Sequence, residues 1–261
     1  MSRSSFLRAI LLIAVLCAAL LDGGFTVPVS KSDITVSAAV SLKDTLEAIA
    51  RLYHDANPDT VVHLNPGASG TLQRQIEQGA PVDVFISASP AEMDGLESRH
   101  LILSDTRRDL VKNSVVLIVP KGQPSVHSFR DLTDPRVKVI AIGDPQSVPA
   151  GAYAKQVLSH FGVYDTLKPK FVFAKDVRQV LTYVETGNAD AGIVYSTDAR
   201  TSQRVSVVAT APEDSHSPVV YPVAVIAGSG NPEAAKAFVQ FLLSSKSAQV
   251  FEQYGFVAGR Q

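Results

Sequence analysis

The sequence contains a single cysteine, and that residue lies near its beginning. Cys17 falls inside an apolar run that extends from Ala9 to Leu21. A chain that loses this run contains no thiol, so disulfides and thiolate metal sites are excluded from it. We therefore expect the fold to depend on the packing of ordinary side chains.

An excess of charge of either sign is also lacking. The chain has 24 Lys and Arg against 25 Asp and Glu, which gives a formal net charge of -1 at pH 7. Without a basic field, binding of nucleic acid is not expected. Histidine and carboxylate side chains are not gathered at metal-ligand spacing, which argues against a metal-cation site, and we expect no cofactor.

Beyond the N-terminus no apolar run is long enough to span a bilayer, which needs about 20 residues. The run from Ala9 to Leu21 follows two arginines and precedes small residues. This order is typical of a secretory signal peptide, although a buried N-terminal helix is the alternative. We predict a signal peptide over residues 1–30, cleaved at about 19–30, and a periplasmic protein. Lipid attachment at Cys17 is a minor alternative, because Leu16 stands where a lipoprotein signal needs a small residue.

The rest of the chain alternates short β-like runs with helical patterns. Ile34–Ala38 is typical of a strand, and apolar residues follow at helical spacing from Leu42 to Tyr53. Strands alternating with helices indicate an α/β protein with largely parallel sheets covered on both faces. The same patterns predict strands at 61–64, 82–86, 137–142, 171–173 and 191–195 and helices at 72–78, from 150, at 177–185 and beyond 231.

Two strongly apolar runs stand out within this pattern, Ser114–Pro120 and Val219–Ile226. We interpret them as two crossings of the chain between lobes, and we expect a hinge there. The predicted first lobe comprises residues 31–114 and 222–261, and the predicted second lobe comprises residues 115–221. We expect the C-terminal helices to return to the first lobe.

Loops that follow the predicted strands share small hydroxyl residues and free backbone amides, with very little charge. In open α/β sheets, ligands bind at the carboxyl ends of the strands, where helix N-termini offer free amides to an anion. Ser41 follows the first strand and Ser69 follows the second. Each serine also stands where a helix N-cap is expected, so capping and ligand binding are both open for them.

Three later positions extend this pattern. Pro149 fits the first position of a helix, which would leave the amide of Ala150 unpaired. Asp176 is the expected cap of the next helix, with the Val177 amide in its first turn. Tyr195 ends a strand, and its hydroxyl fits either a core contact or a ligand contact.

A set of motifs carries a resemblance to a known family. Together the motifs resemble the periplasmic molybdate-binding proteins of ABC transporters, from about residue 34 to the end of the chain. The motifs are Val36–Leu42, Gly67–Leu72, Gly79–Ser87, Gly143–Pro145, Val148–Gly151, Tyr153–Lys155, Gly192–Tyr195, Glu213–His216 and Tyr254–Phe256.

The resemblance implies an α/β, two-lobed type II periplasmic-binding-protein fold, with a mostly parallel sheet in each lobe and two crossover strands joining the lobes. It implies capture of molybdate or tungstate between the lobes and delivery to the membrane permease of an ABC transporter. It also implies a monomer that performs no chemistry, with molybdenum held only as the oxyanion. Val40 and Gly70 depart from the alanine and serine that are frequent in the family. The ligand contacts that the resemblance implies are Ser41, Ser69, Ala150, Val177 and Tyr195.

The chemistry of these groups fits an oxyanion without reference to the family. Neutral hydroxyls and amides at helix N-termini stabilise a dianion, while their geometry selects its size. We therefore expect sulfate to be rejected as too small and tungstate to be accepted. A binding protein for sulfate or another oxyanion is the first alternative, because only the motifs favour molybdate.

A serine hydrolase is the alternative from a different class. Ser69, Asp198 and His216 occur in the chain order of an α/β-hydrolase triad. Thr71 stands where the nucleophile elbow of that class needs a glycine, so the pattern is incomplete. We expect a binding protein and not an enzyme.

Overall fold

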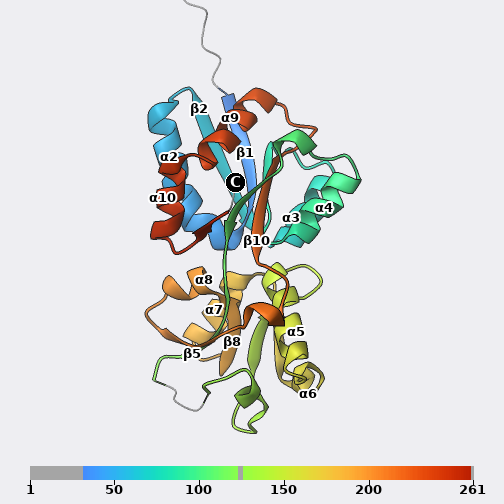
Figure 1. Ribbon diagram of the computed structural model, residues 1–261, viewed down its shortest axis with the longest axis vertical. Coiled ribbons are helices and arrows are strands. Elements are labelled where there is room, and N and C mark those ends of the chain that lie inside the picture. The colour runs from blue at the N-terminus through green and yellow to red at the C-terminus, as the bar shows by residue number, and fades with distance from the viewer. Residues whose placement is uncertain (1–31, 123–125, 260–261) are drawn as a thin grey trace, which may run out of the picture. The chain divides into compact units, whose positions relative to one another are not determined.

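The computed structural model describes residues 32–122 and 126–259. The predicted signal peptide and Cys17 lie outside the described residues. Within the described part the chain forms two β-sheets, each covered by helices on both faces, and we refer to each sheet with its helices as a lobe (Figure 1). No helix in these two ranges combines the length and the apolar character that crossing a bilayer requires.

The first lobe is built on a mixed sheet with the strand order β11-β4-β10-β3-β1-β2. Strands β1 (Ser32–Ala39), β2 (Thr60–Gly67) and β3 (Val84–Ile86) are parallel to one another. The antiparallel strands are β4 (Arg108–Lys112), β10 (Val220–Val225) and β11 (Val257–Ala258). One face carries α2 (Lys43–Ala56), α9 (Pro232–Leu242) and α10 (Ser245–Gln253), and the other carries α3 (Ser69–Glu77) and α4 (Pro90–Ser98) (Figure 1).

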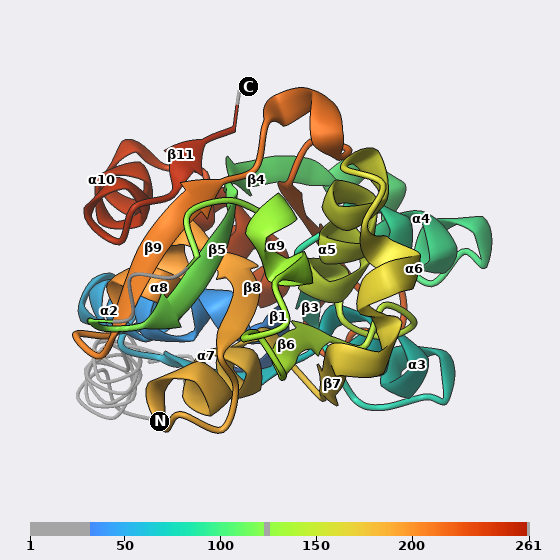
Figure 2. The same cartoon turned by 90° about the horizontal axis from the view of Figure 1, so that it is seen from below.

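The second lobe is built on a five-stranded sheet with the order β7-β6-β8-β5-β9. Strands β6 (Ile140–Gly143), β7 (Phe171–Ala174) and β8 (Ala191–Tyr195) are parallel to one another. Strand β5 (Val115–Pro120) pairs antiparallel with β8 on one side and with β9 (Val205–Thr210) on the other. Helices α5 (Pro149–His160) and α6 (Tyr164–Leu167) cover one face, and α7 (Val177–Glu185) and α8 (Ser196–Arg200) cover the other (Figure 2). Short 3-10 turns are η1 (Val40–Leu42), η2 (Ser104–Thr106), η3 (Arg130–Thr133), η4 (Lys168–Lys170) and η5 (Glu213–Ser215).

The two-lobed α/β architecture predicted from the sequence is confirmed. The central strands are buried on both faces, which explains why β5 and β8 are continuous apolar runs in the sequence. Side chains such as Ile34, Leu117 and Phe238 are fully buried between sheet and helices. Each such side chain stabilises the fold by about 1.5–3 kcal/mol. The sheets are mixed and not mostly parallel, because the strands that flank the crossings pair antiparallel with their neighbours.

The crossings between the lobes lie beside the two apolar runs and not within them. Val115–Pro120 is β5 of the second sheet, and Val220–Val225 is β10 of the first. The chain changes lobe at residues 113–114 and again over residues 211–219, and the backbone N–H of Asn113 donates to the carbonyl oxygen of Val219 at 3.1 Å. The apolar character of the runs therefore reflects burial inside a sheet, and the connections between the lobes are the shorter segments beside them.

Candidate functional site

A small cavity lies between the lobes, at the carboxyl ends of the parallel strands of both sheets. All five residues predicted as ligand contacts line this cavity, although they come from five separate elements of the chain. None of the side chains that line it is charged. The first lobe contributes Ala39, Val40, Ser41, Gly67, Ser69 and Ala88, and the second contributes Val148, Pro149, Ala150, Val177 and Tyr195.

Both serines hydrogen-bond away from the helix that each precedes or opens. Ser41 lies in η1, and its Oγ lies 3.0 Å from Tyr221 Oη. Ser69 is the first residue of α3, and its Oγ accepts a hydrogen bond from the backbone N–H of Ala88 at 3.0 Å. The N-cap interpretation is therefore wrong for both residues. Their hydroxyls belong to the wall of the cavity.

Two helices of the second lobe begin at the cavity. Helix α5 begins at Pro149 as predicted, and Pro149 has no N–H. Asp176 caps α7, as predicted, by accepting from the backbone N–H of Gln179 at 2.8 Å. The amides of Ala150 and Val177 have no acceptor within their own helices, because they lie in the first turn. Each thus offers a donor to the cavity at the positive end of a helix dipole.

Glycine allows two close backbone approaches beside the cavity. A Cβ on Gly151 would lie 2.0 Å from the carbonyl oxygen of Gly143, so glycine lets the start of α5 pack against the end of β6. Gly70 brings the lobes together, since its N–H donates to the carbonyl oxygen of Ser147 at 3.1 Å. A Cβ on Gly70 would meet that same oxygen at 2.8 Å. Glycine at these two positions therefore permits close packing of the backbone next to the cavity.

Tyr195 ends β8 with its hydroxyl unsatisfied. The residue is 1% exposed, and its Oη has no hydrogen-bond partner among the described residues. Its ring packs edge-on against Tyr221 and Tyr153, with ring centroids 5.8 and 6.4 Å away. Burial raises the pKa of Tyr195 well above its usual value, so the hydroxyl keeps its proton. A buried polar group without a partner costs about 1–3 kcal/mol, and a ligand in the cavity would offset that cost.

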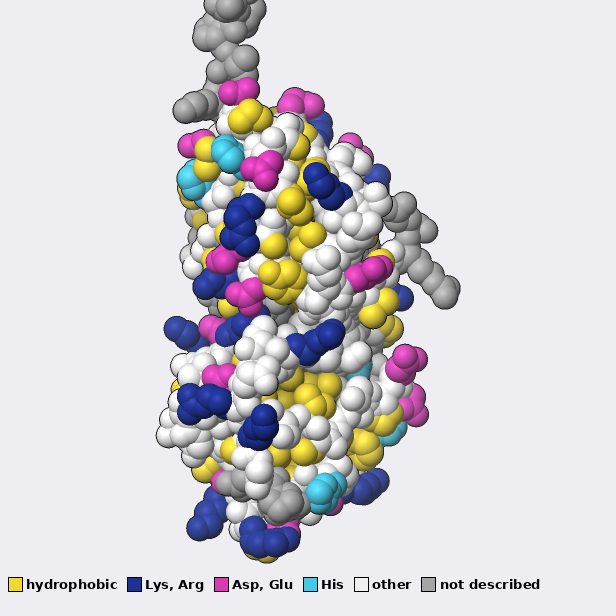
Figure 3. All heavy atoms as spheres, turned by 90° about the vertical axis from the view of Figure 1, so that its left-hand side faces the viewer, with side chains coloured by type: hydrophobic (Ala, Val, Ile, Leu, Met, Phe, Trp, Pro, Cys, Tyr) yellow, Lys and Arg dark blue, Asp and Glu magenta, His cyan; other side chains and the backbone are white. Residues whose placement is uncertain are grey.

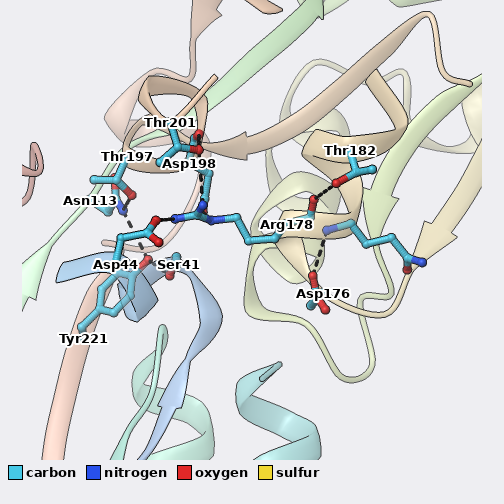
Figure 4. A network of polar contacts seen from close by, with 11 residues as sticks. Ser41, Asp44, Asn113, Asp176, Arg178, Thr182, Thr197, Asp198, Thr201 and Tyr221 are labelled. Atoms are coloured by element: carbon cyan, nitrogen blue, oxygen red, sulfur yellow. Dashed lines mark hydrogen bonds and ion pairs between the residues drawn. The ribbon is translucent and has the colours of Figure 1, made fainter. Parts of the chain in front are cut away.

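An ion-pair network that the sequence did not reveal joins the lobes beside this cavity. Arg178 of α7 donates through Nη2 to Asp44 Oδ2 at 2.8 Å and through Nε to Asp198 Oδ1 at 2.6 Å (Figure 4). Asp44 belongs to the first lobe, whereas Arg178 and Asp198 belong to the second. Burial raises the pKa of the fully buried Asp198 to about 6, although the Arg178 charge opposes this rise.

A second, larger cavity lies next to this network. It shares Ser41 with the first cavity, but its wall carries Asp44, Arg178 and Arg200. The wall of the larger cavity is therefore charged, whereas the wall of the smaller cavity is not. The remaining residues that line the larger cavity are Thr45, Thr197, Thr201, Gln253, Tyr254 and Phe256.

The triad of the alternative hydrolase interpretation is not assembled. Asp198 pairs with Arg178, Ser69 pairs with the Ala88 amide, and His216 Nδ1 lies 2.7 Å from the carbonyl oxygen of its neighbour Ser217. Within residues 32–122 and 126–259, no group of three or more His, Cys, Asp or Glu side chains is placed to hold a metal ion.

Acidic and basic side chains are interspersed on the face drawn in Figure 3, with apolar side chains between them. No basic patch of the kind that binds nucleic acid covers this face. The mixture agrees with the nearly balanced charge of the sequence.

Three further residues belong to the site but were missed from the sequence. Tyr221 is a fully buried residue of β10, and Ala88 follows β3 with its amide against Ser69. Asn113 lies at the first crossing between the lobes. No local pattern marks these residues, because their partners are distant in the chain. Tyr221, for example, is 180 positions from Ser41.

Two α/β lobes that enclose a cavity of uncharged hydrogen-bond donors define a solute-binding protein. The chain belongs to the family of bacterial extracellular solute-binding proteins, which matches residues 34–257. It is 43% identical over 228 residues to the molybdate-binding protein ModA of Escherichia coli (strain K12), covering 85% of this chain and 88% of that protein. With ModA of Haemophilus influenzae the identity is 39% over 240 residues, covering 90% and 93%.

Comparison with solved structures agrees with this family. The structure is similar to that of the periplasmic molybdate-binding protein of Azotobacter vinelandii, with a TM-score of 0.79, 24% identity, and coverage of 87% of this chain and 100% of that one. This likeness confirms the predicted type II fold. The family resemblance stated from the motifs is also confirmed, and the family is one of exported proteins.

Proposed function

We propose that this protein binds molybdate or tungstate in the interlobe cavity and delivers the ion to the membrane permease of an ABC transporter. The observation that supports this proposal most is the set of neutral donors around the cavity: the hydroxyls of Ser41, Ser69 and Tyr195 and the amides of Ala150 and Val177. A fully deprotonated tetrahedral oxyanion accepts hydrogen bonds on every oxygen, so its chemistry matches a wall of donors. The two ModA relatives favour molybdate over other oxyanions.

The same geometry supports a closing motion. On one side of the cavity Gly70 bonds Ser147, and on the other Asp44 pairs with Arg178. The cavity takes its donors from both lobes, so opening these contacts would move the donors apart and release the ion. We propose that the two lobes rotate about the crossings at residues 113–114 and 211–219, as periplasmic binding proteins do in general.

The remaining parts of the proposal follow from a binding role. The protein acts as a monomer without a cofactor, performs no chemistry on the ion, and is exported by the predicted signal peptide over residues 1–30. Binding by neutral groups favours release to a permease, because a site neutralised by Arg or Lys would hold a desolvated dianion through strong charge-assisted bonds.

Calorimetric titration of the ligand-free mature chain tests the proposal. Molybdate and tungstate are expected to bind with similar affinity, and sulfate and phosphate are expected to bind far more weakly. Solution scattering should show a smaller radius of gyration with saturating molybdate than without it. Equal affinities for sulfate and molybdate would contradict the proposed ligand, and an unchanged radius of gyration would contradict the closing motion.

A further inference from the structure

We propose that Tyr221 and Asn113 are positioning residues that fix the Ser41 hydroxyl as a hydrogen-bond donor to the bound oxyanion. The inference rests on the proposed function, because it concerns the same cavity. Figure 4 shows the chain of contacts from Ser41 through Tyr221 to Asn113 and Thr197. The direction of each hydrogen bond in this chain follows from the chemistry of its members.

The orientation of the Asn113 carboxamide is fixed at one end by a backbone amide. Asn113 Oδ1 accepts from the backbone N–H of Ser114 at 2.9 Å and from Ser196 Oγ at 3.0 Å. A backbone N–H can only donate, so the carbonyl oxygen must face it. The amide nitrogen therefore faces the other way, where it donates to Thr197 Oγ1 at 2.9 Å and to Tyr221 Oη at 3.3 Å.

The Tyr221 hydroxyl can then donate in only one direction. The Asn113 nitrogen offers no lone pair, so it cannot accept the phenolic proton. Ser41 Oγ, 3.0 Å away, is the acceptor that is left to Tyr221 within residues 32–122 and 126–259. Tyr221 is fully buried, and burial raises its pKa well above the usual value. The phenol therefore stays protonated and can donate a hydrogen bond.

Ser41 consequently accepts from the protein and donates its own proton elsewhere. Tyr221 is the one hydrogen-bond partner of its hydroxyl in the described part of the chain, and Ser41 lines the ligand cavity. Ser69 reaches the same state by another route, since its Oγ accepts from the Ala88 amide. Hydrogen bonds in such a chain polarise one another, so each strengthens the next.

This arrangement bears on specificity as well as on affinity. A freely rotating serine hydroxyl can accept a hydrogen bond from the O–H group of a partly protonated anion such as hydrogen phosphate. A serine whose acceptor position is already occupied by Tyr221 can do so less well. The chain from Asn113 to Ser41 therefore favours an oxyanion that carries no proton, of which molybdate at neutral pH is one.

A double-mutant cycle on molybdate affinity tests the inference. Tyr221→Phe should weaken molybdate binding about three- to tenfold, the effect of one neutral hydrogen bond. In a Ser41→Ala background the same substitution should have almost no further effect, because the hydroxyl that Tyr221 orients is gone. Tyr53→Phe is the matched control, since Tyr53 is also buried in the first lobe but packs against Phe238 and Phe241.

A second variant covers the case in which Tyr221→Phe does not fold. Asn113→Asp keeps the size of the side chain but replaces the nitrogen that faces Tyr221 with an acceptor oxygen. Tyr221 should then donate to this oxygen, and Ser41 should turn its proton towards Tyr221. Binding should fall by at least as much as in Tyr221→Phe, and by much less in the Ser41→Ala background, where any effect of the added charge still remains.

The outcomes separate the two proposals. If the parent chain does not bind molybdate, the proposed function fails. If the parent binds, and the effects of Ser41→Ala and of Tyr221→Phe or Asn113→Asp simply multiply, Tyr221 has only a structural role and the inference is overturned. Affinity unchanged in both Tyr221→Phe and Asn113→Asp would overturn it as well.

Discussion

The two cavities between the lobes meet at Ser41 but use opposite chemistry. The smaller cavity has no charged side chain in its wall, whereas the larger one carries Asp44, Arg178 and Arg200. Both cavities lie where the lobes approach each other, so charged side chains lie close to the smaller cavity without lining it. The absence of charge is therefore a property of the smaller cavity and not of the whole interlobe region.

The difference indicates a division of roles. Arg178 follows Val177 in α7, yet its guanidinium turns away from the small cavity to bind Asp198 and Asp44. A cation directed at the ligand would bind any anion of suitable charge and would hold it strongly. Directed at Asp44, the same cation forms an ion pair between the two lobes. We infer that neutral groups select the ion and that charged groups hold the closed form.

The largest effect on stability is expected when a charge that lines the larger cavity is removed. Arg178→Met leaves the fully buried Asp198 without its partner, and such unpaired buried charges cost about 3–5 kcal/mol. Chemical denaturation at pH 8 should show a loss of this size, and Asp198→Asn in the same background should restore part of it. Arg136→Met is the control, because Arg136 is 73% exposed in its ion pair with Asp134 and should cost no more than about 1 kcal/mol.

Removing a neutral donor from the smaller cavity should affect binding more than stability. Ser41→Ala and Ser69→Ala should each weaken molybdate binding by about 1.5–3 kcal/mol, the usual value for a hydrogen bond to a charged group. Calorimetric titration measures the loss, and thermal melting of the ligand-free variants shows that they are folded. Ser98→Ala, at an exposed serine of α4, is the control. Parent-like binding by both variants would place the site elsewhere.

Most residues of the smaller, uncharged cavity could be predicted from the sequence, because the patterns that mark them are local. A strand, a small hydroxyl residue and a helical pattern occur together at Ser41 and Ser69, and proline or aspartate marks the starts of α5 and α7. Parallel strands then bring these loops to one edge of each sheet. Helix α7 and strand β8 have the bounds that the sequence predicts, because their apolar patterns end at clear capping or turn residues.

The ion pairs beside the larger cavity could not be predicted in this way. Asp44 and Arg178 are 134 positions apart, and each is also an ordinary first-turn residue of an amphipathic helix. Their pairing depends on how the two lobes meet, which no local pattern encodes. The same reason explains why the crossings were placed inside β5 and β10: burial between strands and passage between lobes both favour apolar residues, and only strand pairing separates them.

The pH dependence of stability sharpens the comparison further. The pKa of Asp198 is raised from 3.8 to about 6 by burial. Between about pH 4 and pH 6 the unfolded chain releases this proton and the folded chain retains it, so the free energy of unfolding should fall as the pH rises. Above pH 6 the group is ionised in both states, and its contribution no longer changes.

Denaturation of the parent and of Asp198→Asn across this pH range measures the effect as the difference between the two curves. We expect that difference to change by about 1–3 kcal/mol, because each unit of pKa shift corresponds to about 1.4 kcal/mol. Asp134 does not interfere, since Arg136 lowers its pKa to about 2 and its titration falls below the range. A flat difference curve would mean that Asp198 is ionised throughout.

The smallest expected effect concerns salt, and it tests the division of roles directly. Molybdate affinity should change by less than about 0.5 kcal/mol between low and high sodium chloride, because fixed neutral donors are not screened as exposed charges are. Any weakening should come from the Asp44–Arg178 pair, whose side chains are 39% and 24% exposed and which supports closure from outside the cavity. Asp44→Asn should therefore bind somewhat more weakly than the parent in low salt, by no more than about 1 kcal/mol. It should also lose the salt dependence that the parent shows.

Calorimetry of both chains at two salt concentrations gives the four affinities that are needed. A steep loss of parent affinity in salt that persists in Asp44→Asn would mean that charge acts on the ion itself, and the separation between a neutral selecting side and a charged closing side would not hold.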